Sequence, residues 1–133
     1  MSVLNANILT GPTISITDGT AKAYTPGGQK VNDGINIVDT TATDYRSRQN
    51  ISLRAKEPVV DKAGTVTVKA TRHATVTHPK VLASGAIDFP CGEIKLKIHP
   101  ENSDAEVLAL KLAMVQVILG SDFENFWKFG SLQ

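Results

Sequence analysis

The residues able to act as nucleophiles or metal ligands are few in this chain and form no recognisable catalytic motif. A single cysteine, Cys91, is accompanied by three histidines, His73, His78 and His99. A thiol beside an imidazole is the pairing of a cysteine nucleophile, but a lone cysteine in a strand is more typical of a small buried side chain. The histidines also lack the paired spacing of a zinc site. We therefore expect no enzyme activity, no metal ion and no cofactor.

The basic residues are distributed in a way that favours a different chemistry, the binding of a polyanion. The chain carries 14 Lys and Arg against 13 Asp and Glu, a formal net charge of +1. Between positions 45 and 99, however, ten Lys and Arg stand against four Asp and Glu, whereas both ends of the chain are acidic. A basic segment within a near-neutral chain favours a polyanionic partner on one surface.

Three segments with alternating apolar and polar residues would place these cations on one side of an antiparallel sheet. They lie at 45–56, 65–77 and 93–99, and a weaker strand is expected at 35–38. Because successive side chains of a strand point to opposite faces, each segment has an apolar face and a polar face. The sheet is therefore predicted to have one buried apolar face and one solvent-exposed polar face.

A β-hairpin is predicted ahead of this sheet. Residues 13–17 and 20–24 are expected to pair around Asp18-Gly19, a sequence typical of two-residue turns. Residues 78–89 are expected to form a loop, and Pro90-Cys91-Gly92 is expected to interrupt the strand there.

After residue 100 the pattern changes to that of two helices. Ser103 and Glu106 have the spacing of a capping box, which predicts a helix from about Asp104 to Leu119. The same spacing recurs in Ser121-Asp122-Phe123-Glu124 and predicts a second, short helix that ends at Gly130. A β-rich part followed by two helices predicts an α+β protein.

The long predicted helix has no polar stripe. Between positions 105 and 119 the polar residues are Glu106, Lys111 and Gln116, and their spacing spreads them around the helix. A helix that is apolar nearly all round must be covered on more than one side, and its length and charges do not suit a membrane span. We therefore predict an obligate dimer without membrane association. The residues expected at its interface are Leu108, Leu112, Val115, Leu119, Phe123, Phe126 and Trp127.

The order of these features resembles the coat proteins of levivirus-type single-stranded RNA bacteriophages. The sequence Ile98-His99-Pro100-Glu101-Asn102-Ser103-Asp104-Ala105-Glu106 resembles the start of their long helix, and Phe126-Trp127-Lys128-Phe129-Gly130-Ser131-Leu132 resembles their tail. The resemblance covers the chain from about Tyr45 onward and, more loosely, the predicted hairpin. It implies one coat-protein domain over 1–133, with the hairpin and sheet at about 13–99 and two dimerisation helices at 103–130.

The resemblance also implies a particular fold and assembly. The fold would have an N-terminal hairpin, an antiparallel sheet of about five further strands and two C-terminal helices. Two copies would form an intertwined dimer with a continuous ten-stranded sheet, and dimers would build an icosahedral virion capsid in the cytoplasm of the bacterial host. By the same resemblance, the loop at 78–89 would lie around the symmetry axes of that capsid; as a bare sequence it is equally typical of a flexible surface loop.

The partners implied are single-stranded RNA, both genome and operator hairpin, and further copies of the chain. In the family the solvent-exposed polar face of the sheet binds RNA, and binding of the hairpin represses replicase translation. Phe89 falls at the position of a base-stacking tyrosine, and Cys91 at that of an amide. The residues expected to bind RNA are Arg46, Arg48, Asn50, Ser52, Arg54, Lys56, Thr67, Lys69, Thr71, Phe89, Lys95 and Lys97.

Two other interpretations fit the residues themselves. The alternating Lys and Arg are also consistent with an exposed sheet face that is simply solvated. A dimeric RNA-binding regulator that forms no shell would share the basic face, since cations with interleaved Thr, Ser and Asn suit phosphates and exposed bases in either protein. Particles containing nuclease-protected RNA would distinguish the coat protein from the regulator.

Overall fold

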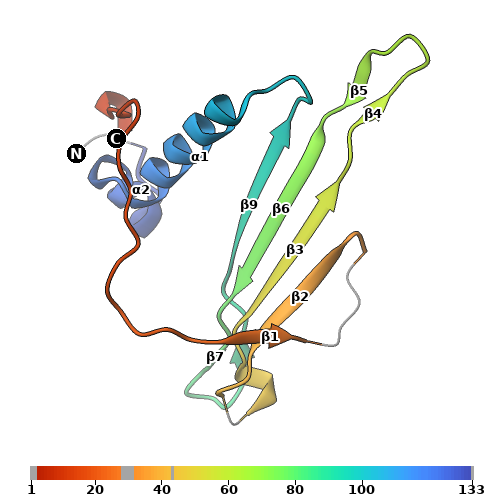
Figure 1. Cartoon of the computed structure of the whole chain (residues 1–133). Helices are drawn as coiled ribbons and strands as arrows, with labels where there is room; N and C mark the ends of the chain where they lie inside the picture. The colour runs from red at the N-terminus through yellow and green to blue at the C-terminus, as the bar shows by residue number, and fades with distance from the viewer. Residues whose placement is uncertain (1–2, 28–31, 43, 133) are drawn as a thin grey trace. The chain divides into compact units, whose positions relative to one another are not determined.

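The computed structural model describes residues 3–27, 32–42 and 44–132. It comprises two compact units (Figure 1). One is Gly19–Pro100, which holds the strands, and the other combines Met1–Asp18 with Glu101–Gln133, which holds the helices.

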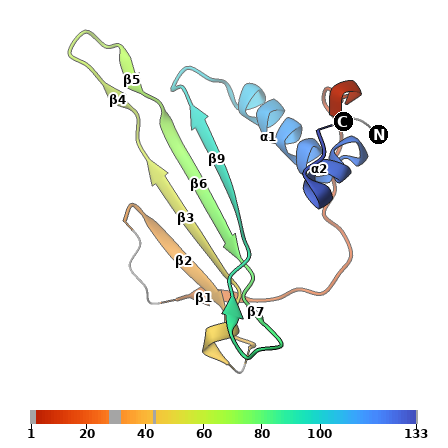
Figure 2. The same ribbon diagram turned by 180° about the vertical axis from the view of Figure 1, so that it is seen from behind.

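The strand unit is built on a five-stranded antiparallel sheet with the order β1-β2-β3-β6-β9, seen from both sides in Figures 1 and 2. Its strands are β1 (Tyr24–Pro26), β2 (Gly34–Asp39), β3 (Asn50–Lys56), β6 (Ala70–Thr77) and β9 (Cys91–Ile98). The expected strands at 35–38, 45–56, 65–77 and 93–99 therefore all contribute, with shifted ends. Their antiparallel arrangement confirms the predicted α+β class.

The registers of the three long strands define the two faces of the sheet. Ile51 of β3 pairs with Val76 of β6, and Leu53 of β3 pairs with Ala74, which pairs in turn with Ile94 of β9. Since side chains alternate along each strand, all of these apolar residues share one face, which we call the apolar face. The opposite side, which we call the polar face, carries the intervening residues of the same strands.

The apolar face is largely uncovered in the described chain. Ala70 is its one buried apolar residue, while Leu53 remains 40% exposed and Ile35 and Ile94 are also exposed. A hollow of about 440 Å³ lies on this face, with Leu53, Ala74 and Ile94 among its lining residues. Burying apolar surface contributes about 25 cal/mol per Å². Contact of this face with another apolar surface would therefore be stabilising.

Two short ribbons extend the strand unit. β4 (Val59–Val60) pairs with β5 (Val66–Val68), and β7 (Lys80–Val81) pairs with β8 (Ile87–Asp88). The first ribbon continues the β3–β6 ladder, because Val59 opposite Val68 keeps the register of Lys56 opposite Thr71. The second ribbon shows that the segment predicted as a loop at 78–89 contains paired residues, with a turn between them.

The hairpin predicted around Asp18-Gly19 is wrong in its position. Asp18 and Gly19 do have the positive φ angles, 68° and 81°, that a two-residue hairpin turn requires. Residues 13–17 and 20–23 nevertheless form no strand, and Ile16 is 99% exposed. An isolated two-stranded hairpin is at best marginally stable in water and needs a further strand beside it. The alternating pattern of residues 13–24 does not provide such a neighbour. The N-terminal hairpin forms instead between β1 and β2.

The helical unit contains the two predicted helices. α1 spans Asp104–Leu119, and Ser103 caps it, since its Oγ accepts a hydrogen bond from the Glu106 N–H at 3.2 Å. Asn102 and Ser103 donate to the Glu106 carboxylate at 2.8 and 3.2 Å, which lowers the pKa of Glu106 below its ordinary value. The capping-box prediction for α1 is thus confirmed.

The second helix begins later than its sequence suggested. Residues Ser121–Phe123 form a 3₁₀ turn, η3, and α2 spans Glu124–Phe129 without a side-chain cap at its start. Gly130 ends α2 with a φ of 67°, the left-handed backbone conformation that glycine commonly adopts after the last residue of an α-helix. The Trp127 indole N–H donates to the Val117 carbonyl at 2.7 Å, so α2 is fixed to the last turn of α1.

Gln116, one of the four polar residues of α1, binds the N-terminal segment of the chain. The Leu9 N–H donates to Gln116 Oε1 at 2.8 Å, and Gln116 Nε2 donates to the Leu9 carbonyl at 3.0 Å. Close by in sequence, the Asn7 N–H donates to Asp122 Oδ2 at 3.1 Å, and a 3₁₀ turn, η1, occupies Val3–Asn5. The unexpected amide on an apolar helix therefore serves as a backbone partner for a segment 107 residues away.

We expect Gln116→Ala to release the first residues of the chain from α1. The variant loses both hydrogen bonds to Leu9, each worth about 1 kcal/mol, so amide exchange at Leu9 should accelerate about tenfold or more. Hydrogen exchange of the N-terminal peptide, read by mass spectrometry, measures this effect. Lys111→Ala, also on α1, is the control, and equal acceleration in both variants would contradict the role of Gln116.

Candidate nucleic-acid interface

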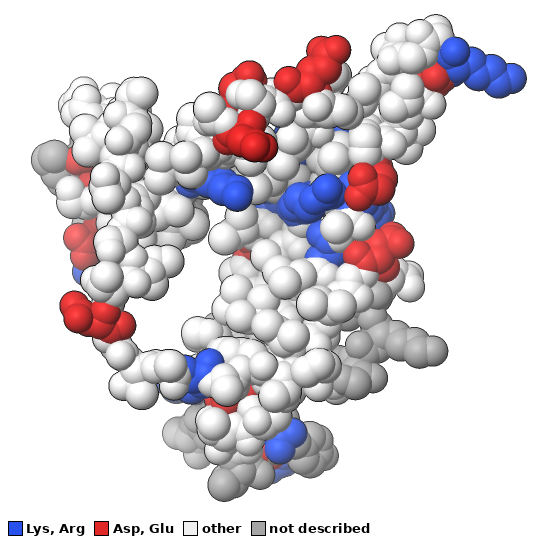
Figure 3. All heavy atoms as spheres, in the orientation of Figure 1, with Lys and Arg blue, Asp and Glu red and all other residues white. Residues whose placement is uncertain are grey.

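Four cations lie together on the polar face of the sheet. Arg54 and Lys56 project from β3, and Lys95 and Lys97 project from β9, with β6 between the two strands. The register aligns them in two rows, Arg54–His73–Lys95 and Lys56–Thr71–Lys97. All four are exposed, and within the described residues none of them has an ion-pair partner. Figure 3 draws one side of the molecule, on which Lys and Arg lie among Asp and Glu over the upper part of the strand unit.

Small polar side chains continue this face toward the other end of β3. Ser52 lies opposite Thr75, and Asn50 lies opposite Thr77. The Ser52 hydroxyl donates to Asn36 Oδ1 on β2 at 3.2 Å, so its orientation is fixed from the neighbouring strand. Hydroxyls and amides in such positions can bond the edges of unpaired bases. The polar face thus combines exposed cations with polar groups able to contact bases.

Seven of the predicted RNA-binding residues are brought together by these registers. The structure places on one face of the five-stranded sheet Asn50, Ser52, Arg54, Lys56, Thr71, Lys95 and Lys97. Their common face follows from strict alternation, which determines the face of each side chain in a long strand. Their contact with RNA stays a prediction.

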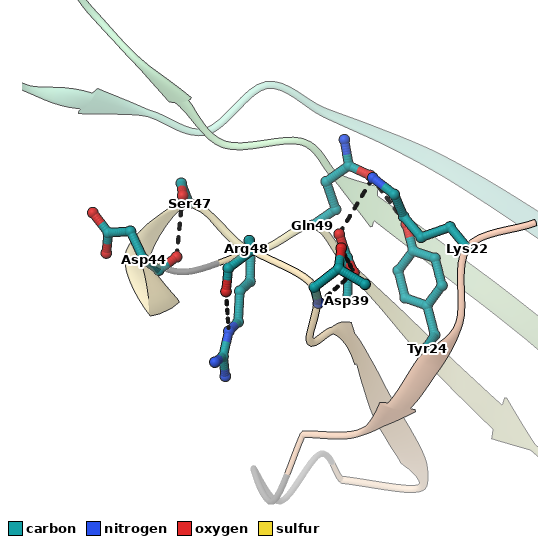
Figure 4. Close-up of polar contacts among 9 residues, drawn as sticks. Lys22, Tyr24, Asp39, Asp44, Ser47, Arg48 and Gln49 are labelled. Atoms are coloured by element: carbon teal, nitrogen blue, oxygen red, sulfur yellow. Dashed lines mark hydrogen bonds and ion pairs between the residues drawn. The ribbon is translucent and has the colours of Figure 1, made fainter. Parts of the chain in front are cut away.

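Arg46 and Arg48 do not share that strand face. The predicted strand at 45–56 is interrupted, because Tyr45–Ser47 forms a 3₁₀ turn, η2, capped by the Asp44 carboxylate. Asp44 also pairs with the Arg46 guanidinium at 3.0 Å, and these hydrogen bonds from Arg46 lower the pKa of Asp44. Arg48 is directed to its own loop, where its Nε donates to the Ala42 carbonyl at 3.5 Å (Figure 4). Local capping by Asp44 overrides the alternation at this point.

Thr67 and Lys69 lie beyond the five-stranded sheet. The strand predicted at 65–77 is divided into β5 and β6, and Lys69 falls between them. Thr67 alternates with Val66 and Val68 in β5, and its hydroxyl donates to the Val59 carbonyl at 3.2 Å. The strand that pairs with β5 and β6 is interrupted at the same level, between β3 and β4. Pro58 lies in this gap and has no backbone N–H to donate.

Phe89 and Cys91 lie at the start of the last strand. β9 begins at Cys91 and runs through Gly92, so the expectation that Pro90-Cys91-Gly92 would interrupt the strand is wrong for its last two residues. Cys91 pairs with Thr77 at the edge of the polar face, and it is exposed rather than buried as its residue type suggested. Phe89 is 59% exposed, which leaves its ring accessible to a planar partner.

A polar network that sequence reasoning missed anchors the end of β2. Asp39 is only 3% exposed, and Oδ1 accepts from the Thr41 hydroxyl at 2.6 Å and from the Thr41 N–H at 2.9 Å. Lys22 lies 3.3 Å from Oδ2 of the same carboxylate. Lys22 and Tyr24 both donate to the Gln49 side chain, immediately before β3 (Figure 4). The network joins β1, β2 and β3 at one end of the sheet.

We expect Asp39→Asn to change the pH dependence of stability. Hydrogen bonds from Thr41, and then the nearby Lys22, hold the pKa of Asp39 below its ordinary value of 3.8. A carboxylate with a lowered folded-state pKa stabilises the fold above its unfolded value, and this contribution is lost as the pH falls through the folded value. The Tm difference between the parent chain and Asp39→Asn should therefore be constant near neutral pH and shrink below pH 3.8. A difference independent of pH in thermal melts would contradict this.

The apolar residues predicted at a dimer interface lie in the helical unit and are incompletely covered there. Leu108, Leu119 and Trp127 are exposed, with 55%, 76% and 54% of their surface accessible, and the remaining four are half-buried. No residue of α1 is buried. The helix therefore has apolar surface left for another partner, as its missing polar stripe predicted.

The described residues contain no group of three or more His, Cys, Asp or Glu arranged to hold a metal ion. Within the same residues, no helix combines the length and apolarity needed to cross a bilayer.

Comparison with known proteins places this architecture among virus particles. No protein-family model and no curated sequence matches the chain. Among solved structures, the virus-like particle of bacteriophage GQ-907 is 32% identical, with a TM-score of 0.90 over 99% of this chain and 100% of that one. The particle of bacteriophage AVE019 is 12% identical, with a TM-score of 0.65 over 90% and 95% of the two chains. The particle of Beihai levi-like virus 21 is 10% identical, with a TM-score of 0.63 over 95% and 97%.

The two more distant structures share the fold, a five-stranded antiparallel sheet followed by two helices. This fold, matched over almost the whole chain, defines a structural capsid protein. The chain belongs to the coat proteins of the levivirus-type RNA bacteriophages.

Proposed function

We propose that the chain assembles as dimers into an icosahedral shell that packages single-stranded RNA, and that it also binds an RNA operator hairpin as a translational repressor. The observation that carries the RNA part is the alignment of Arg54, Lys56, Lys95 and Lys97 on one face of the sheet, without ion-pair partners in the described chain. Phosphates are the natural counter-ions for such a face. Virus-like particles are the form in which similar proteins were solved.

Three features support the dimer. The apolar face is exposed around Leu53, and α1 keeps apolar surface in its own unit. β9 is an edge strand of eight residues, with β6 as its one neighbour in the described sheet. An edge of unpaired backbone groups is a template for another strand. Antiparallel pairing of two β9 strands would give a ten-stranded sheet, and the partner's helices would then cover the apolar face.

A dimeric RNA-binding regulator that forms no shell would have the same polar face and the same dimer as a coat protein. Particle formation therefore distinguishes the two functions. The full chain is expressed alone, the lysate is treated with nuclease, and the large fraction from size exclusion is examined by electron microscopy. Uniform shells holding protected RNA are the expected result. A dimer that binds RNA but never forms particles, with or without added RNA, would contradict the shell and favour the regulator.

Phe89→Ala should weaken binding of a cognate hairpin more than binding of unstructured RNA. An exposed ring two residues before β9 can stack on an unpaired base, and such stacking contributes about 1–3 kcal/mol per base. The hairpin is first selected from random RNA on the parent dimer, and affinities are then measured by filter binding. Equal losses for hairpin and homopolymer would remove Phe89 from hairpin recognition.

A further inference from the structure

His73 occupies the centre of the polar face. It lies on β6, paired with Arg54 on one side and with Lys95 on the other, so that its imidazole stands in the middle of a row of cations. Its side chain is 21% exposed. His73 was not among the residues predicted to bind RNA, although its alternation with Ala74 placed it on the same face as Lys56 and Lys97.

The imidazole has an unused hydrogen-bonding atom. His73 Nε2 is buried and has no hydrogen-bond partner among the described residues. Its nearest acidic atom is Glu93 Oε2 on β9 at 3.7 Å, which is too long for a hydrogen bond and becomes an ion pair only when the ring is protonated. A buried polar atom without a partner is costly in a finished structure, and the ion pair with Glu93 that forms on protonation would offset that cost.

The charges around His73 determine how it responds to a bound anion. Arg54 and Lys56 face it from β3, Lys95, Lys97 and Glu93 from β9, and its same-face neighbours on β6, Thr71 and Thr75, are neutral. The cations oppose a further positive charge on the ring, and one carboxylate offsets them in part. A phosphate bound to the exposed Arg54 and Lys95 would neutralise the cations on both sides of the ring. Its binding would therefore favour the protonated ring.

We propose that His73 takes up a proton when RNA binds to the polar face, so that the affinity for RNA rises as the pH falls. The inference rests on the proposed RNA binding and adds a regulation to it. Coupling between two ligands is reciprocal: if phosphate favours the protonated ring, protonation strengthens phosphate binding to the same degree. Imidazole is the side chain that ordinarily changes its charge between pH 5 and 8, which sets the pH values of the test. A dimer carries two such groups.

The test compares RNA affinity at two pH values with the purified full-length dimer. The probe is unstructured oligopyrimidine RNA, bound at fixed ionic strength at about pH 5.5 and about pH 8. We expect the parent chain to bind about tenfold more tightly at the lower pH, corresponding to about one proton taken up over one pH unit. His73→Gln should abolish most of this difference, whereas His78→Gln, at an exposed position just beyond β6, should retain it.

A second measurement does not depend on any variant. Titration of the parent dimer with RNA, in two buffers that differ in ionisation enthalpy, gives the number of protons taken up on binding. Uptake near neutral pH that disappears in His73→Gln supports the inference, and no uptake by the parent chain overturns it even if the variant does not fold. RNA binding of equal strength at both pH values overturns the inference while leaving the proposed RNA binding intact. Absence of RNA binding at either pH overturns both.

Discussion

Leu53→Asp should prevent dimer formation and therefore shell formation. Leu53 lies at the middle of the apolar face, between Ile35 on β2 and Ala74 on β6, and it lines the hollow on that face. A carboxylate at this position would have to be desolvated when the face is covered, and Arg72 on the same face already lies 3.7 Å from Glu57, so the substitution costs several kcal/mol. We expect the dimer dissociation constant to rise by at least about a hundredfold, as measured by sedimentation equilibrium.

Ser52→Asp is the matched control, because it introduces the same charge one residue away. Ser52 lies on the polar face, beside Asn36 and Thr75. This variant should still form dimers but bind RNA less tightly, since it adds a negative charge next to the cations. Far-UV circular dichroism of both variants distinguishes loss of association from loss of secondary structure. An unchanged dissociation constant in Leu53→Asp would show that the apolar face is not the dimer interface.

The parts of the fold that local rules determine could be predicted from the sequence. α1 begins at Asp104 because Ser103 caps it, and both the start and the end at Leu119 match the prediction. β3, β6 and β9 were recognised by alternation, and their faces followed without knowledge of their partners. In each case the signal lies within a few residues of the feature that it determines.

The parts that depend on distant partners could not be predicted. Alternation at 13–17 indicated a strand, but no neighbouring strand pairs with it in the described chain, and Ile16 stays exposed. Gln116 was interpreted as an isolated polar residue, because its partner Leu9 is 107 residues away in the sequence. Arg46 read as part of β3, whereas the nearby Asp44 caps a 3₁₀ turn there. The rows across the polar face, and the central place of His73 in one of them, required the registers themselves.

Replacing Lys56 and Lys97 together by Ala should greatly weaken RNA binding and the retention of RNA in particles. The two lysines flank Thr71 in one row of the polar face, and neither has an ion-pair partner in the described chain. A dimer loses four cations. Each phosphate contact to single-stranded nucleic acid contributes about 0.7 to the slope of log K against log salt concentration. The slope should therefore fall by about 3 in a salt titration followed by filter binding.

The double variant Lys62→Ala/Lys80→Ala separates the effect of this face from that of total charge. Lys62 lies in the turn of the β4–β5 ribbon and Lys80 in β7, so both are outside the five-stranded sheet. The two double variants have the same net charge, and a long-range attraction of RNA to the whole molecule would weaken binding equally in both. A loss confined to Lys56→Ala/Lys97→Ala would assign the phosphate contacts to the polar face. Equal losses would contradict that assignment and leave general electrostatic attraction as the basis of RNA binding.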